Sequence, residues 1–241
     1  MKTLILFLLL FLFFPQQEFS QSSSGQQSRS FKKKVARDVS GKYLLFLPAD
    51  YGKTKKRFPL IMYLHGGSIR GDNVEKVRTL GLPQLLEQDK SFPFIVVSPL
   101  SPAGEIWTDT EMLIGILDEV GSKYRVDAER VYLTGHSMGG RGTWYLAYKY
   151  PERFAAIVPM SPVSTISAWA SKLKKVPVWA FHGAKDNNAP IEESKTLIDA
   201  LKAIGGDVKF TELTNRDHFI LDMYEDMQLY EWFLQHRRKA K

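Results

Sequence analysis

Short apolar runs alternate with longer amphipathic stretches from about residue 40 to the end of the chain. Seven runs predict β-strands. The middle runs are apolar at nearly every position, which is typical of parallel strands that are buried on both faces. The predicted strands are residues 42–47, 60–64, 94–98, 130–134, 156–159, 176–181 and 208–212.

Three stretches between these runs have apolar residues at helical spacing. The first, residues 109–124, begins with Thr108 and Glu111, a Ser/Thr-x-x-Glu pattern that predicts a capping box. The second covers residues 190–204, where a glycine pair ends it, and the third covers about 222–235. Strands alternating with helices predict an α/β fold with a mostly parallel sheet and helices on both faces.

The first residues have a different pattern. An unbroken apolar run, residues 4–14, follows Lys2, and polar and small residues come next. Spanning a bilayer takes about 20 apolar residues, so the run predicts a secretory signal peptide over residues 1–22. The cut is expected near Ser20-Gln21-Ser22. The mature protein is then expected to be secreted or periplasmic, without stable membrane insertion.

Charge and composition divide the rest of the chain. The formal net charge is +7, but the excess basic residues gather in 29–37 and 237–241, and the body between them is close to neutral. Solvated basic ends are therefore favoured over nucleic-acid binding. Residues 23–38 are expected to be a disordered basic linker, and 39–237 one catalytic domain. The absence of cysteine excludes both disulfides and a thiol nucleophile.

Residues 135–140 read GHSMGG and directly follow the predicted strand 130–134. A Gly-x-Ser-x-Gly sequence between a strand and a helix predicts a tight turn that exposes the serine hydroxyl above the sheet edge. Ser137 is therefore the candidate nucleophile. The alternative is a glycine-rich turn with a capping serine.

A serine hydroxyl needs a base to become a good nucleophile. Of the five histidines, His218 lies in a loop after the last predicted strand. Loops at the carboxyl ends of parallel strands share one edge of the sheet, so His218 can meet Ser137 there. The alternative role is a surface histidine that caps a helix.

The acid that orients the base is expected at the same edge. Asp186 follows the predicted strand 176–181 and is the favoured residue. Asp217, the direct neighbour of His218, and Asp222 are the rivals.

An oxyanion needs two N–H donors. Met138, the residue after the serine, is expected to supply one. The sequence His-Gly-Gly-Ser after the strand 60–64 is expected to supply the other, from Gly67 first and Ser68 second. Ser68, His136 and Trp107 are further candidates for the substrate pocket, although core packing is an equal alternative for Trp107. No metal-binding or nucleotide-binding motif is found, and no cofactor is expected.

These motifs together resemble the esterase and "predicted peptidase" branch of the α/β-hydrolase superfamily, from about Tyr43 to Trp232. Relatives of this kind include dienelactone-hydrolase-like proteins and feruloyl and acetyl-xylan esterases. The resemblance implies Ser137 as nucleophile, Asp186 as acid and His218 as base. Two segments depart from the family pattern, Asp217-His218-Phe219 and Gly67-Ser68-Ile69, and both make the expected pocket more apolar. The resemblance is carried by YLLFLPADYG, PLIMYLHGGSIRGDN, the stretch around GHSMGG, VPVWAFHGAKDNNAPIEES and RDHF.

The expected protein is a secreted serine hydrolase with no large cap domain, because the spacing from Ser137 to Asp186 leaves little room for an insertion. Its expected substrates are short-chain or polysaccharide-linked acyl esters. The alternatives are a peptidase of the prolyl oligopeptidase type and a non-catalytic binding module on the same fold.

Overall fold

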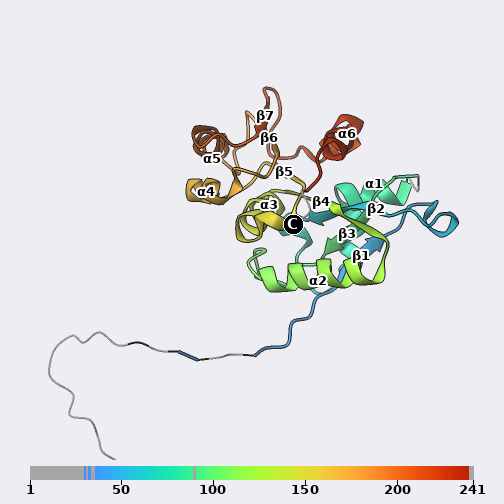
Figure 1. The fold of residues 1–241 in the computed structure, drawn as a ribbon. Helices are drawn as coiled ribbons and strands as arrows, with labels where there is room; N and C mark the ends of the chain where they lie inside the picture. The colour runs from blue at the N-terminus through green and yellow to red at the C-terminus, as the bar shows by residue number, and fades with distance from the viewer. Residues whose placement is uncertain (1–29, 31, 34–35, 89–90, 239–241) are drawn as a thin grey trace, which may run out of the picture. The chain divides into compact units, whose positions relative to one another are not determined.

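A seven-stranded sheet forms the centre of the structure (Figure 1). Its strands lie in the order β1-β3-β2-β4-β5-β6-β7. All neighbours are parallel except β1, which pairs antiparallel with β3. The strands are β1 (Tyr43–Phe46), β2 (Phe58–Leu64), β3 (Ile95–Pro99), β4 (Val126–His136), β5 (Ala156–Met160), β6 (Val178–Gly183) and β7 (Val208–Leu213).

The computed structural model describes residues 30, 32–33, 36–88 and 91–238. The predicted leader, residues 1–22, and most of the predicted linker, residues 23–38, lie outside the described residues. Contacts divide the chain at Arg37, and the residues from Asp38 onward form one compact unit that contains the sheet. In the part of the chain that the structure describes, no helix is both long enough and apolar enough to cross a membrane.

All seven predicted strands are confirmed, with ends that differ by a few residues. The near-continuous apolar runs follow from burial on both faces of the sheet. In β2, for example, Leu60 and Met62 point into one hydrophobic cluster, whereas Ile61 and Tyr63 point into the other. Each strand position is therefore apolar, because neither face meets water.

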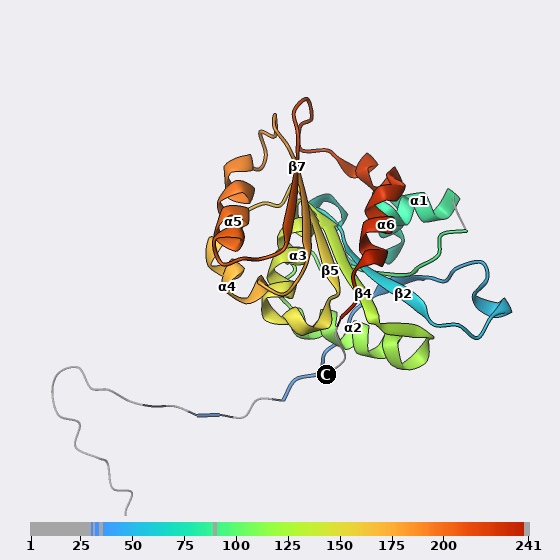
Figure 2. The same cartoon turned by 45° about the horizontal axis from the view of Figure 1, so that its top comes forward.

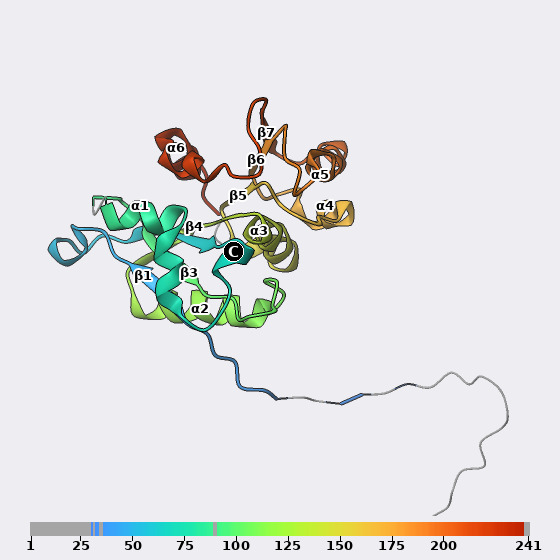
Figure 3. The same cartoon turned by 180° about the vertical axis from the view of Figure 1, so that it is seen from behind.

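Helices cover both faces of the sheet. The cluster on one face receives side chains from α2, α3, α4 and α5, and the cluster on the other receives them from α1 and α6. Figure 2 shows α3, α4 and α5 on one side and α1 and α6 on the other. Figure 3 shows α2 beside β1 and β3. The helices are α1 (Leu82–Gln88), α2 (Thr110–Lys123), α3 (Met138–Lys149), α4 (Ala170–Leu173), α5 (Ile191–Ala203) and α6 (Met227–Gln235).

The start of α2 differs from the predicted capping box. The prediction that Thr108 caps this helix is wrong, because Asp109 occupies the N-cap and its Oδ1 accepts the N–H of Met112 at 3.1 Å. Aspartate and threonine both cap well, so the pattern cannot decide between neighbouring candidates. The carbonyl of Thr108 instead accepts the N–H of Thr110.

The predicted last helix is divided in two. A 3₁₀ helix, η6 (Leu221–Glu225), precedes α6, and Asp226 lies between them with extended backbone. Asp226 caps α6 by accepting the N–H of Gln228 at 2.9 Å. The break allows Tyr224 to turn inward, where its hydroxyl contacts the Thr134 hydroxyl at 3.0 Å.

The connection between β5 and β6, residues 161–177, packs into the core. It contains the 3₁₀ helix η5 (Ser167–Trp169) and α4, and both Trp169 and Leu173 are buried in one of the two clusters. The carboxyl ends of β2 and β4 to β7 meet at one edge of the sheet, because these strands run parallel. That edge brings together loops from distant parts of the sequence.

Candidate active site

Ser137 stands between the last residue of β4 and the first residue of α3. Its backbone has φ 58° and ψ −119°, a conformation that few residues other than glycine adopt. Its N–H donates to the carbonyl of Met160 at 2.9 Å, which ties the turn to β5. The Gly-x-Ser-x-Gly segment therefore forms the strained strand-to-helix turn that the sequence predicts.

The glycines of this turn are required by close backbone contacts. A Cβ atom on Gly139 would lie 1.8 Å from the carbonyl oxygen of Leu64, and one on Gly135 would lie 2.5 Å from the carbonyl oxygen of Gly139. No side chain can be accommodated at these distances. The first turn of α3 thus packs directly on β2.

The three residues predicted to form the catalytic set lie within hydrogen-bonding distance of one another. The Nε2 of His218 is 2.8 Å from the Oγ of Ser137, and its Nδ1 is 2.8 Å from the Oδ2 of Asp186. The rival carboxylates are bonded elsewhere. Asp217 accepts the N–H of Phe219, and Asp222 pairs with Arg216 at 2.6 Å.

Asp186 is held as a carboxylate by a dense set of donors. Its side chain is fully buried, and its Oδ1 accepts the N–H groups of Asn188 and Ala189, each at 2.8 Å. Burial alone would raise the pKa of Asp186, but the hydrogen bonds from His218, Ala189 and Asn188 outweigh burial and hold the pKa below its ordinary value. A second imidazole, that of His182, places its Nε2 3.2 Å from Oδ2.

His136 supports the loop that carries His218. Its buried ring places Nε2 2.6 Å from the carbonyl oxygen of His218, and this oxygen can only accept, so Nε2 carries the proton. Burial lowers the pKa of His136 to about 4, so the ring is neutral near pH 7. The sequence places His136 within the serine turn but does not reveal this bond to the loop of His218.

Both predicted oxyanion donors are the first residues of helices. Met138 begins α3, and Gly67 begins the 3₁₀ helix η2 (Gly67–Ile69), so neither N–H has a partner within its helix. The glycine loop lies against the serine turn, since a Cβ atom on Gly66 would be 3.7 Å from the Cβ of Ser137. The N–H groups of Met138 and Gly67 stay the predicted oxyanion donors.

The remaining pocket candidates lie in different surroundings. Ser68 is exposed at the surface. Trp107 is only 2% exposed, and its Nε1 donates to the carbonyl of His65 at 2.9 Å. His136 is buried as described above. A contact of Ser68, His136 or Trp107 with substrate stays a prediction.

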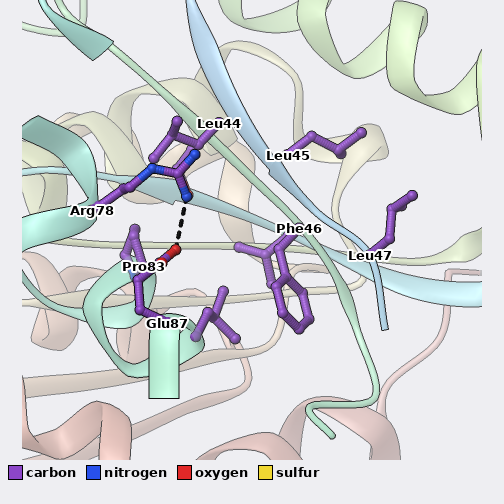
Figure 4. Close-up of a pocket in the computed structure, with 10 residues that line it drawn as sticks. Leu44, Leu45, Phe46, Leu47, Arg78, Pro83 and Glu87 are labelled. Carbon is purple, nitrogen blue, oxygen red and sulfur yellow. Dashed lines mark hydrogen bonds and ion pairs between the residues drawn. The ribbon is translucent and has the colours of Figure 1, made fainter. Parts of the chain in front are cut away.

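A separate cavity of about 200 Å³ lies beside β1 and α1 (Figure 4). Figure 4 shows Arg78 and Glu87 facing each other in it, and their ion pair measures 2.7 Å. Apolar side chains such as Leu44 and Phe46 form the rest of its wall. None of the predicted site residues lines this cavity.

The chain is similar to known ester hydrolases in sequence and in structure. A family model described as PET hydrolase-like matches residues 115–233. A bifunctional acetylxylan esterase/xylanase from Neocallimastix patriciarum is 30% identical over 135 residues, which cover 54% of this chain and 19% of that protein. Cutinase est1 from Thermobifida alba is 34% identical over 96 residues, which cover 39% of this chain and 31% of that protein.

Among solved structures, a thermostable esterase is 27% identical and superposes with a TM-score of 0.68, covering 81% of this chain and 59% of that one. The chain spans less than two thirds of each of these three relatives. The sheet order, the serine turn and these similarities agree with the resemblance drawn from the sequence. The chain has the α/β-hydrolase fold and is similar to esterases of that superfamily, and its PET hydrolase-like match points to the same group.

Proposed function

We propose that this chain is a secreted serine esterase that hydrolyses carboxylic esters through an acyl-enzyme. The observation that carries the proposal is the relay from Ser137 to His218 to Asp186, with both contacts at 2.8 Å. The backbone of Ser137 also has φ 58°, the conformation of a tight turn between a strand and a helix. Nucleophile, base and orienting acid are the parts that acyl transfer needs.

In the proposed reaction, the Oγ of Ser137 attacks the ester carbonyl carbon while Nε2 of His218 takes the hydroxyl proton. The N–H groups of Met138 and Gly67 donate to the oxyanion of the tetrahedral intermediate. The protonated His218 then gives its proton to the departing alcohol, which leaves an acyl-enzyme. Water, activated by His218, attacks the acyl carbonyl and releases the acid, and Asp186 stabilises the imidazolium throughout.

The proposed substrates are short-chain acyl esters, either free or attached to polysaccharides. The body of the chain is close to neutral, which favours neutral substrates over polyanions. Apolar side chains stand exposed in loops at the carboxyl edge of the sheet, with Phe219 64%, Ile166 50% and Ile106 42% exposed. Such side chains can pack against the apolar parts of an ester. The relative from Neocallimastix patriciarum, which carries an acetylxylan esterase activity in its name, supports the same class.

Hydrolysis of p-nitrophenyl acetate by the protein without its leader tests the reaction. The wild-type protein is expected to release p-nitrophenol, and Ser137→Ala is expected to lower kcat by on the order of 10⁴-fold or more. Ser122→Ala is the matched control, since this serine is exposed on α2 and its hydroxyl donates to the carbonyl of Glu119. Equal rates for wild type and Ser137→Ala would refute the mechanism.

Two further assays separate the alternatives. A peptidase would cleave proline-containing chromogenic peptides faster than the ester. A binding module would hydrolyse neither substrate, and a fluorophosphonate probe would leave its Ser137 unlabelled.

Secretion is tested by expressing the full chain with its own leader. Exported protein whose sequence begins near residue 23 supports the proposal, and protein retained in the cytoplasm with residues 1–22 intact contradicts it.

A further inference from the structure

Three successive carbonyl groups of the glycine loop are each held by a side chain. The carbonyl of His65 accepts from Nε1 of Trp107 at 2.9 Å. The carbonyl of Gly66 accepts from Nδ1 of His65 at 2.7 Å, and that of Gly67 accepts from Nε of Arg70 at 3.0 Å. His65 and Arg70 donate within the loop's own stretch of sequence, whereas Trp107 donates from 42 positions away.

The bond to Gly66 fixes the direction of the oxyanion donor. In a trans peptide, the C=O and the following N–H point in opposite directions. Holding the carbonyl of Gly66 therefore turns the N–H of Gly67 the other way. The proton on the ring of His65 is settled by a second bond, because the N–H of Ser101 donates to Nε2 at 3.0 Å and leaves the ring proton on Nδ1.

Trp107 is placed on this loop at a conformational cost. Its backbone has φ 46°, which is strained for a bulky aromatic residue. Space for it is made in α3, where a Cβ atom on Gly142 would lie only 2.8 Å from the Cβ of Trp107. A glycine inside a helix is less favourable than alanine. The ring also packs edge-on against His65, with 4.8 Å between centroids.

Strain of this kind persists where the surrounding structure requires it, and it gathers at functional sites. Trp107 and Arg70 each bond a carbonyl that flanks the peptide between Gly66 and Gly67. Arg70 also reaches the carbonyl of Glu105 at 3.4 Å, which joins the glycine loop to the loop that carries Trp107. The two loops are thus locked to each other around the predicted donor.

We propose that Trp107 and Arg70 are positioning residues that act with His65 to aim the N–H of Gly67 at the oxyanion formed on Ser137. This inference rests on the proposed function. It assigns Trp107 a part in stabilising the transition state, in place of a wall of the substrate pocket. An aimed donor strengthens transition-state binding while leaving the binding of the uncharged ester nearly unchanged.

The test is Trp107→Phe, which keeps an aromatic ring and removes the N–H. Loss of a whole oxyanion donor costs about 10²–10³ in kcat, so a donor that remains but is poorly aimed should cost about tenfold in kcat, with KM changed less than about twofold. Arg70→Met removes the second clamp from a partly exposed position and should lower kcat in the same way. If Trp107→Phe fails to fold, the kcat of Arg70→Met tests the proposal.

A boronic acid supplies a readout that a purely structural role would not move. Phenylboronic acid adds to the Oγ of Ser137 as its proton passes to His218, and the tetrahedral anion mimics the intermediate. Its inhibition constant should rise by the same factor as kcat falls. Trp179→Phe is the matched control, because its Nε1 donates at 2.9 Å to Thr211, between β6 and β7, and its rate and inhibition constant should equal those of wild type.

Each outcome decides the inference. Wild-type kcat and inhibition constant in both Trp107→Phe and Arg70→Met overturn it, and so does a loss confined to KM, which would make Trp107 a substrate contact. Either result leaves the proposed function intact as long as Ser137→Ala remains inactive. If the wild-type protein hydrolyses no ester in a Ser137-dependent way, the proposed function fails and the inference falls with it.

Discussion

Asp186 shows how single residues set the chemistry of this site. Its carboxylate accepts two backbone N–H groups and contacts two imidazoles, those of His218 and His182. Such a set keeps the group ionised and fixes the direction of each lone pair. The carboxylate can then hold the proton of His218 on Nδ1, which leaves Nε2 free to accept from Ser137.

Asp186→Asn is therefore expected to lower kcat by on the order of 10⁴-fold, because an amide nitrogen facing Nδ1 would favour the wrong tautomer of His218. The measurement is steady-state hydrolysis of p-nitrophenyl acetate. Asp217→Asn is the matched control, since an asparagine oxygen can still accept the N–H of Phe219 and kcat should stay close to wild type. A larger loss in Asp217→Asn than in Asp186→Asn would show that the neighbouring aspartate is the true acid.

At the scale of secondary structure elements, three buried histidines lie at or beside the carboxyl ends of strands. His65 follows β2, His136 ends β4, and His182 lies within β6. The rings of His65 and His182 bond the backbone just beyond their own strands, at Gly66 and Ala189, whereas the ring of His136 bonds the carbonyl of His218 in the loop after β7. Burial lowers the pKa of all three, to about 4 for His65 and His136. These neutral rings link the strand ends to the loops of the candidate site.

These histidines predict a steep pH dependence of stability. Their pKa is about 6.5 in the unfolded chain, so between pH 6.5 and 4 the unfolded state binds more protons than the folded state. The free energy of unfolding therefore decreases as the pH is lowered through this range. Near pH 5.5, unfolding should take up about two protons through His65 and His136, with a further contribution from His182. Calorimetric unfolding in buffers of different ionisation enthalpy measures this uptake. An uptake near zero would contradict the neutral, buried state of these rings.

The sequence predicts elements better than it predicts these contacts. The strands are runs rich in apolar residues and bounded by turns, and all seven could be identified for that reason. The capping of α2 by Asp109 and the break at Asp226 depend on choices among equally good capping residues. The bonds of His65 to Ser101, of His136 to His218 and of Trp107 to His65 join residues 36, 82 and 42 positions apart. No local pattern encodes these partners.

At the scale of the whole molecule, the two ends of the parallel strands differ in what they contact. The carboxyl ends carry the candidate site, whereas the start of β4 binds the C-terminal arginines Arg237 and Arg238. The basic C-terminal end, which the sequence suggests is solvated, lies against the start of β4 as far as it is described. Arg237 pairs with Asp127 and Glu129, each at 3.1 Å. The guanidinium of Arg238 bonds the carbonyl of Ala128.

Arg238 contributes more to this attachment than its neighbour. Besides Ala128, its side chain donates to the carbonyl of Glu152, and its own N–H donates to the carbonyl of Glu129 at 2.8 Å. Hydrogen bonds from a charged group to carbonyls are stronger than neutral ones, and truncation leaves those carbonyls without their partner. We therefore expect Arg238→Ala to lower the free energy of unfolding by about 1–3 kcal/mol.

Urea unfolding of full-length protein measures this loss, and kcat/KM for p-nitrophenyl acetate should stay at the wild-type value, because Ala128 lies near the start of β4 and Ser137 follows its end. Arg237→Ala is the matched control. Its ion pairs involve a side chain that is 53% exposed, and exposed pairs contribute about 0–1 kcal/mol. An equal or larger loss in Arg237→Ala, or a fall in kcat/KM for Arg238→Ala, would contradict the separation of anchoring and catalysis between the two ends of the parallel strands.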